Sequence, residues 1–376
     1  MSLREDAWYF NPSPRTWLPP VPRAKAFHAR LPGYAPTPLV DAPELAAMLG
    51  VGRVLIKDES ARFDLGAFKI LGAIWACFEA LAAESGYAGP PDLEALRGHL
   101  ASHASPDGAA FTLVTATDGN HGRAVARSAR LVGLPAVIFL PRDVPAAVLD
   151  RIEAEDAAIT IVGADYDGAV AAAKAFVAAG SGRLLIQDMG WSGYEQIPDR
   201  IVEGYLTLTA EIDEQAASLG VDGIDLVATG LGNGTFGQAV VRHFRGTGRK
   251  RRTRVLGVEP DTAACLLASL RAGRMITVPT STTIANGLNC GTPSSTGWPW
   301  LRDGLSAAVA VSDDDLRAAI AALAKVGVAS GPSGCAALAG LTAALTEPSR
   351  RSQLGIEATS VVVAVSTEGP IPGVTG

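Results

Sequence analysis

The feature that most constrains the fold is a regular alternation of short apolar segments and longer amphipathic segments from residue 111 onward. The short segments predict strands at Phe111–Ala116, Ala136–Leu140, Ile159–Val162, Leu184–Gln187, Leu226–Thr229, Arg254–Glu259, Ala307–Val311 and Ser360–Val365. The longer segments predict helices at Gly122–Leu131, Pro145–Glu155, Tyr166–Ala179, Pro198–Ser218, Phe236–Phe244, Ala263–Ala272, Asp313–Lys325 and Ser333–Leu345. Such alternation is typical of mainly parallel sheets covered by helices on both faces. The sequence therefore predicts an α/β fold.

The length of the chain and its composition shifts predict two domains. A chain of 376 residues is long enough for two sizeable cores. The polar stretch from Ser85 to Pro106 is rich in Gly and Pro and predicts a surface insertion near a hinge. We expect residues 1–80 and 190–376 to form a large domain and residues 81–189 a small one. Eight prolines within residues 1–40 exclude a continuous helix there and predict an extended surface arm.

Charge and composition narrow the class of partner. The net charge of −6 gives no reason to expect a nucleic acid or an anionic membrane as partner. The first six residues lack the apolar core of a signal peptide, and no apolar run approaches the ~20 residues of a membrane helix. We therefore expect a cytoplasmic protein that acts on a small molecule.

The cysteines and histidines do not predict a metal centre. The four cysteines have no CxxC spacing, so reduced thiols are expected, with a disulfide between Cys265 and Cys290 as an open alternative. The five histidines are scattered and form no ligand pair at helical spacing. We predict no metal.

One lysine stands out at the start of a helix. A predicted strand, Arg53–Lys57, runs through a polar loop into a helix that begins near Ala67 and carries Lys69 in its first turn. A helix N-terminus disfavours a cation, and apolar flanks such as Phe68 remove solvent, so both effects are expected to lower the pKa of Lys69. A neutral lysine amine can react with an aldehyde cofactor.

Three loops at strand ends carry residues suited to ligand binding, because ligands of α/β folds bind beyond the carboxyl ends of the strands. In the first loop, Thr117-Asp118-Gly119-Asn120-His121-Gly122, Asp118 or Asn120 can simply cap the following helix. Alternatively, exposed backbone N–H groups of this loop bind an anion. Both interpretations are open from the residues alone.

The second loop, residues 229–237, contains Gly230, Gly232, Asn233, Gly234 and Thr235 between a strand and a helix. Glycines at a helix N-terminus admit a phosphate group. The same loop also fits a dinucleotide-binding turn, with Glu259 at the end of the next strand as the ribose acceptor. That alternative predicts a nicotinamide-dependent oxidoreductase.

The third loop begins at Ser366, directly after the apolar strand. Its hydroxyl can bond a neutral aromatic nitrogen, although an ordinary turn explains the loop equally well. Taken together, a buried lysine, a phosphate loop, a carboxylate loop and this hydroxyl are the groups that pyridoxal phosphate needs.

The combination resembles the fold-type II pyridoxal-phosphate enzymes, the group of threonine dehydratase and the tryptophan synthase β chain. The resemblance implies two domains, each with a mainly parallel sheet, and a cofactor held by the large one. It implies that Phe68 and Lys69 contact the cofactor and that Asn120 touches its ring hydroxyl.

Within this group the chain most resembles the diaminopropionate ammonia-lyases. The resemblance rests on segments in the same order as in that family: residues 57–60 and 67–69, 117–122, 187–191, 193–194, 197–198, 257–261, 287–291 and 366–369. It implies a lyase that converts 2,3-diaminopropionate, as D or L isomer, to pyruvate and ammonia. It also implies a homodimer.

The two aspartates separate this prediction from its relatives. Asp118 and Asp188 are expected to be catalytic and to hold the second ammonium group of the substrate. Thr117, Gly119 and His121 are expected to bind substrate as well, and the resemblance implies that Lys69 and Asp118 serve opposite faces of Cα. Asp188 acting as a loop cap is the structural alternative. A serine or threonine dehydratase, or a β-replacing synthase, on the same scaffold is the functional alternative.

Overall fold

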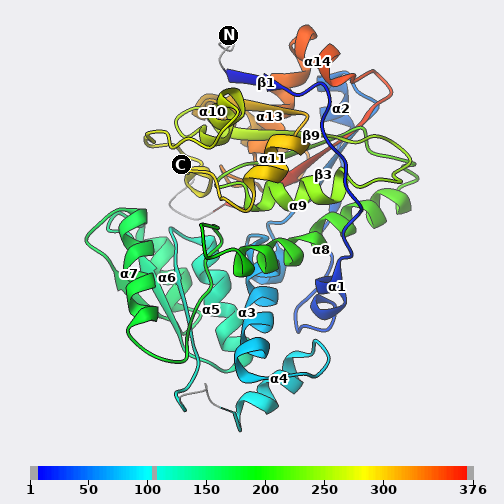
Figure 1. Ribbon diagram of the computed structural model, residues 1–376. Coiled ribbons are helices and arrows are strands. Elements are labelled where there is room, and N and C mark those ends of the chain that lie inside the picture. The colour runs from blue at the N-terminus through cyan, green and yellow to red at the C-terminus, as the bar shows by residue number, and fades with distance from the viewer. Residues whose placement is uncertain (1–6, 104–107, 371–376) are drawn as a thin grey trace.

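The computed structural model describes residues 7–103 and 108–370, and it contains two sheets (Figure 1). The larger sheet has 7 strands in the order β1-β10-β9-β8-β11-β3-β2, and the smaller has 4 in the order β6-β5-β4-β7. The strands are β1 (Trp8–Phe10), β2 (Leu39–Asp41), β3 (Arg53–Asp58), β4 (Thr112–Ala116), β5 (Ala136–Leu140), β6 (Ala158–Ile161), β7 (Arg183–Leu185), β8 (Leu226–Gly230), β9 (Arg254–Pro260), β10 (Ala307–Val311) and β11 (Val361–Ser366). Among the strands of the described residues, only the edge strands β1 and β2 pair antiparallel, so the predicted mainly parallel α/β fold is confirmed.

The helices follow the predicted alternation, with boundaries that differ by a few residues. They are α1 (Arg23–His28), α2 (Pro43–Leu49), α3 (Lys69–Ser85), α4 (Leu93–Leu100), α5 (Asn120–Val132), α6 (Ala146–Glu153), α7 (Tyr166–Ala178), α8 (Gln196–Ser218), α9 (Thr235–Phe244), α10 (Cys265–Ala272), α11 (Trp298–Gly304), α12 (Asp313–Lys325), α13 (Ala336–Leu345) and α14 (Pro348–Leu354), with 3₁₀ turns η2 (Arg62–Asp64) and η3 (Asn286–Leu288). None of the helices within the described ranges is long and apolar enough to cross a membrane.

The strands of the two sheets come from different parts of the chain. All strands of the small sheet lie between residues 112 and 185, and those of the large sheet lie before residue 59 and after residue 225. The predicted division into residues 1–80 with 190–376 and residues 81–189 stays a prediction. Residues 1–6 and 371–376 of the predicted large domain, and residues 104–107 of the small one, lie outside the described residues.

Strand β3 shows how the large sheet is buried on both faces. Val54 and Ile56 belong to the apolar cluster that includes α13 and α2. The alternate residue Leu55 belongs to the opposite cluster, which includes α8 and α9. Successive side chains of a strand point to opposite faces, so a buried sheet needs apolar residues at almost every position. Lys57 is the exception, and it is fully buried.

Helix α3 joins the two domains. It packs against α5 beside the small sheet and against α8 beside the large one (Figure 1). Ten of its residues are buried, including Trp75 and Phe78. An apolar helix that is covered on several sides cannot shift without breaking packing. The first residue of α3, Lys69, is therefore fixed at the boundary between the domains.

The N-terminal arm differs from its prediction. Leu18 and Val21 are exposed as expected, but β1 pairs with β10 and α1 buries Phe27 and His28. The prolines separate these elements rather than keep the whole arm extended. The exposed arm prediction is wrong for this part, because tertiary packing stabilises a short helix that the local sequence does not favour.

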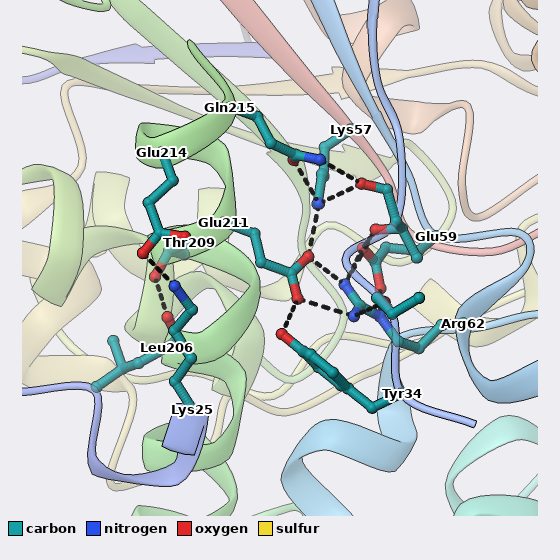
Figure 2. A network of polar contacts seen from close by, with 12 residues as sticks. Lys25, Tyr34, Lys57, Glu59, Arg62, Leu206, Thr209, Glu211, Glu214 and Gln215 are labelled. Carbon is teal, nitrogen blue, oxygen red and sulfur yellow. Dashed lines mark hydrogen bonds and ion pairs between the residues drawn. The ribbon is translucent and has the colours of Figure 1, made fainter. Parts of the chain in front are cut away.

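Four buried charges lie between β3, its following loop and α8 (Figure 2). Lys57, Glu59, Arg62 and Glu211 are each at most 1% exposed. Arg62 donates to Glu59 at 2.8 Å and to both oxygens of Glu211 at 2.7 and 2.9 Å, and the Nζ of Lys57 lies 2.6 Å from Glu211. The two cations balance the two carboxylates, which is the condition under which charges tolerate burial.

Neutral groups from the N-terminal segment complete this network (Figure 2). The hydroxyl of Tyr34 donates to Glu211 at 2.8 Å, and the hydroxyl of Thr37 donates to Glu59. Lys57 also donates to the backbone oxygen of Thr37 at 2.8 Å and to Gln215 at 2.9 Å. The network thus joins three segments that are distant in sequence.

We predict that Glu211→Gln destabilises the protein strongly. The substitution leaves the buried Arg62 and Lys57 with only one carboxylate, and breaking a buried pair costs about 3–5 kcal/mol. The free energy of unfolding from urea denaturation measures the loss. Glu214→Gln is the matched control on the same helix: Glu214 is 63% exposed and pairs with Lys25, so its loss should be below about 1 kcal/mol. Similar small losses for both variants would contradict a structural role of the network.

Candidate functional site

Lys69 is held at the start of α3 by the aromatic residue before it. The Phe68 ring packs between Tyr205 of α8 and Phe236 of α9, with ring centroids 4.8 and 4.4 Å away. The Phe68 N–H donates to the backbone oxygen of Thr367 at 3.3 Å. The predicted position of Lys69 in the first turn of a helix is observed, and Phe68 fixes the backbone from which it projects.

The loop before Lys69 has a strained backbone and is hydrogen-bonded to the small domain. Phe63 and Asp64 have φ values of 51° and 57°, in the left-handed region that residues other than glycine seldom adopt. The carbonyl oxygen of Leu65 accepts hydrogen bonds from Arg123 at 2.9 Å and from Arg151 at 2.7 Å. These two arginines belong to α5 and α6. The position of the loop therefore depends on both domains.

Lys69 and Asp188 form an ion pair in the site. The Nζ of Lys69 donates to Asp188 Oδ2 at 2.6 Å, and the side chains are 23% and 8% exposed. Burial alone lowers the pKa of Lys69, but the carboxylate of Asp188 outweighs burial and raises that pKa above its ordinary value. The lowered pKa predicted for Lys69 is therefore wrong for this arrangement, because helix position and apolar flanks did not reveal the carboxylate.

The same pair keeps Asp188 ionised. Burial alone raises the pKa of Asp188, but the Lys69 cation outweighs it, and the pKa is lowered to about 2. The side chain of Asp188 does not act as a loop cap. Its backbone oxygen accepts from Thr235 Oγ1 at 2.6 Å and Asn233 Nδ2 at 3.3 Å, so the glycine-rich loop holds Asp188 in place.

The first predicted loop places Asp118 near these two charges. Thr117 Oγ1 accepts the N–H groups of Gly119 and Gly122 at 3.0 and 3.1 Å, so Thr117, and neither Asp118 nor Asn120, shapes the turn into α5. Asp118 accepts a 3.4 Å hydrogen bond from Asn286. Its carboxylate is free of a capping role and faces the site.

The electrostatic surroundings of Asp118 differ from those of Asp188. The pKa of Asp118 is raised to about 6: burial is the largest cause, the charges of Asp188 and Glu368 act in the same direction, and the Lys69 cation opposes them. Asp118 therefore lies close enough to Lys69 and Asp188 for their charges to shift its pKa. Two carboxylates beside one amine can hold an ammonium group and exchange protons with it.

His121 lies behind Asp188. Its Nε2 is 2.7 Å from the carbonyl oxygen of Ile186, which can only accept, so the ring carries its proton on Nε2. Nδ1 lies 3.8 Å from Asp188 Oδ2. Burial lowers the pKa of His121, so the ring is neutral. Its unprotonated Nδ1 has no hydrogen-bond partner within the described residues.

The glycine-rich loop fits a phosphate group. It leads into the 10-residue helix α9, and Gly234 has a φ of 94°, in the region that favours glycine. No protein group among the described residues accepts from the N–H groups of Gly232 or Gly234. A Cβ on Gly232 would lie 3.2 Å from Gly287 O and 3.3 Å from Cys290 Sγ. Unpaired N–H groups at a helix N-terminus are suited to an anion.

The third loop begins at a buried hydroxyl. Ser366 ends β11 and is 1% exposed, and its hydroxyl lies 2.8 Å from that of Ser330. A hydroxyl has one donor and two acceptor positions, so this pair can turn to meet a ring nitrogen. The residues present fit pyridoxal phosphate: Lys69 suits its aldehyde, the glycine-rich loop its phosphate, and Ser366 its ring nitrogen.

Several contacts could not be read from the sequence. Glu368 reaches Asn120 of the small domain, and the Tyr205 hydroxyl is buried with no hydrogen-bond partner within the described residues. The sequence assigns no role to Glu368 within residues 366–369, and it does not single out Tyr205. A buried carboxylate next to a loop that binds a ligand would have been the signal for Glu368.

Glu259 does not support the dinucleotide alternative. Its oxygens accept the N–H groups of Leu266 and Leu267 at 2.8 and 2.7 Å, at the start of α10, and it is fully buried. It is therefore engaged in capping and cannot reach a ribose. Cys265 and Cys290 are free thiols. No cluster of His, Cys, Asp and Glu suited to a metal occurs within residues 7–103 and 108–370.

Comparison with known proteins agrees with the geometry. The family described as pyridoxal-phosphate dependent enzyme matches residues 30–368. The diaminopropionate ammonia-lyase of Escherichia coli (strain K12) is 33% identical over 355 residues, which cover 92% of this chain and 87% of that protein.

Solved structures of the Escherichia coli enzyme have the same fold. Its complex with D-serine has a TM-score of 0.86 and 31% identity, and the match covers 97% of this chain and 94% of the other. Its complex with an aminoacrylate-PLP azomethine reaction intermediate has a TM-score of 0.82 and 30% identity, with 96% and 92% covered. Since the sequence match and the fold agree, the chain belongs to the pyridoxal-phosphate dependent enzymes and, within them, to the diaminopropionate ammonia-lyases.

Proposed function

We propose that this chain is an ammonia-lyase that converts 2,3-diaminopropionate to pyruvate and ammonia by α,β-elimination. The ion pair between Lys69 and Asp188 carries this proposal. At 2.6 Å it presents a carboxylate that already binds an ammonium group inside the site. When the Lys69 amine is engaged by the cofactor, Asp188 is left to bind the second ammonium of the substrate.

The cofactor contacts follow from the same geometry. Lys69 would hold pyridoxal phosphate through Nζ, and the N–H groups of Gly232 and Gly234 would hold its phosphate. Gly230, Asn233 and Thr235 shape that loop, Ser366 would meet the ring nitrogen, and Asn120 the ring hydroxyl. When bound, the cofactor withdraws electron density from the substrate Cα.

The protein's own groups then handle the protons. Lys69 and Asp118 would each remove the α-proton from one face, so both D and L isomers would react. Asp188 would keep the departing β-amino group protonated, which makes it a better leaving group. The loop that carries Asp118 would be kept in its shape beside the substrate by Thr117, Gly119 and His121.

A homodimer in the cytoplasm completes the proposal. The family resemblance supports it. A serine or threonine dehydratase is the comparison against which the substrate assignment is tested, because its substrate offers a hydroxyl where diaminopropionate offers an ammonium.

We predict that removing either aspartate charge harms diaminopropionate selectively. Asp118→Asn and Asp188→Asn keep the shape but lose a charge-assisted contact worth ~1.5–3 kcal/mol, so kcat/KM should fall at least about tenfold more for diaminopropionate than for serine. Asp118→Asn should also discriminate D from L, whereas Asp188→Asn should not. Asp165→Asn, at the start of α7, is the control, because Asn caps a helix as well as Asp. Equal losses on both substrates would assign the aspartates a structural role.

Lys69→Ala should abolish covalent attachment of the cofactor. The wild-type protein mixed with pyridoxal phosphate should show a visible absorption band and a borohydride-fixed adduct at Lys69, and the variant should show neither. Lys325→Ala, at the exposed end of α12, should behave like the wild type. An adduct that maps to another lysine would refute the assignment of Lys69.

The pKa of Asp118 sets an acid limb in the pH profile. Burial raises this pKa to about 6, and the ionised form is needed to bind ammonium or accept a proton. Hence kcat/KM should fall as the pH drops through about 6, while Asp188, with a pKa lowered to about 2, stays ionised. Asp118→Asn should lose this limb. Substrate titrations affect both proteins alike, so an unchanged limb in the variant would rule out Asp118 as its source.

A further inference from the structure

Glu368 is a buried carboxylate that links the two domains inside the site. It lies in the loop after β11 and is 6% exposed. Its Oε1 accepts the N–H of Ser333 at 3.1 Å, and its Oε2 accepts from Nδ2 of Asn120, the first residue of α5 in the small domain. One side chain therefore receives hydrogen bonds from both domains.

The backbone around Glu368 is fixed to the segment that carries Lys69. The N–H of Gly369 donates to Gly66 O at 2.9 Å, and the N–H of Gly331 donates to Glu368 O at 2.9 Å. Glu368 also forms an isolated antiparallel bridge with Ala67. A carboxylate on so constrained a backbone has little freedom to follow Asn120, so Asn120 must adapt to it.

The chemistry of the pair fixes how the Asn120 amide is turned. An ionised carboxylate only accepts hydrogen bonds, so the amino group of Asn120, and not its oxygen, must face Glu368. That amino group has two N–H donors. One is used by Glu368, and the other is available to an acceptor in the site.

We propose that Glu368 is a positioning residue that turns the Asn120 amide so that an N–H group faces the ring oxygen of pyridoxal phosphate. The proposal rests on the proposed cofactor contact of Asn120. It explains why a charged residue is buried here: a neutral side chain would not dictate which end of the amide faces the cofactor.

Helix capping alone accounts for only half of the arrangement. The bond from Ser333 places the carboxylate just before α13, where an anion is favourable. That role requires a single oxygen and no partner in the small domain. The contact with Asn120 has no capping function, and it is the one that reaches the site.

Glu368→Gln tests the proposal without changing the size of the side chain. The Ser333 N–H keeps the remaining oxygen, so the new amino group faces the Asn120 amino group, and Asn120 must turn over. Fluorescence titration with pyridoxal phosphate should show a dissociation constant about tenfold higher than wild type. The absorption band of the bound cofactor should also shift, a change that lost stability alone does not produce.

A double-variant cycle separates the possible outcomes. Asn120→Ala should weaken cofactor binding by itself, and adding Glu368→Gln to it should cause no further loss, because Glu368 acts through Asn120. Additive losses, or an unchanged band and affinity in Glu368→Gln, would overturn the proposal for Glu368. If Asn120→Ala itself has no effect, the proposed contact of Asn120 falls instead, and this inference falls with it.

Two further variants keep the test decisive. Glu259→Gln is the matched control, since Glu259 is a buried carboxylate that accepts the backbone N–H groups of Leu266 and Leu267 within the large domain; it should leave the band unchanged. If Glu368→Gln does not fold, Glu368→Asp keeps the charge but is too short to reach Ser333 and Asn120 together. It should shift the band in the same way, and an unshifted band would overturn the proposal.

Discussion

The buried charge network around Arg62 is the interaction on which the site's geometry depends. Two cations and two carboxylates at most 1% exposed are stable only as a complete set, since each would be costly to bury alone. The network ties Glu59 and Arg62 to Glu211 of α8. Glu59 and Arg62 precede the strained turn at Phe63, so the network fixes the start of the loop that ends at Lys69. An apolar core could supply the same stability but would not fix the direction of this loop so closely.

The charges in the site shift the pKa of Lys69 in the direction opposite to the one that the local sequence indicates. A lysine at a helix N-terminus between apolar residues is expected to have a lowered pKa, yet Asp188 raises that of Lys69. Asp188 comes from the small domain, 119 residues away in sequence. The balance between burial and a single neighbouring charge decides the sign.

What the sequence predicts well are features set by local periodicity and loop chemistry. The parallel sheets, the glycine loop before α9 and the first-turn position of Lys69 all follow from patterns within about twenty residues. What it does not predict depends on contacts between distant segments. Helix α1, the partner of Lys69 and the contact of Glu368 with Asn120 could not be derived, because a pattern shows that a residue is polar and near a loop but not which distant residue it meets. For the same reason the sequence does not decide whether Asp118 caps a helix or takes part in catalysis. Only the fold shows that Thr117, rather than Asp118, accepts the Gly122 N–H at the start of α5.

The division of the site between two domains has an energetic consequence. The large sheet and the elements next to it supply Lys69, the glycine-rich loop and Ser366. The small sheet and the elements next to it supply Asn120 and Asp188. Any ligand that contacts both sets gains affinity only to the extent that the domains are already held at the right distance. Contacts that hold the domains without the ligand, such as Arg151 on Leu65 and Asn120 on Glu368, therefore reduce the ordering cost of binding. By linkage the ligand stabilises these same contacts in return. The free energy of cofactor binding therefore depends on how the two domains are held together. A residue that joins the domains beside the cofactor ring affects catalysis even when it never touches the substrate.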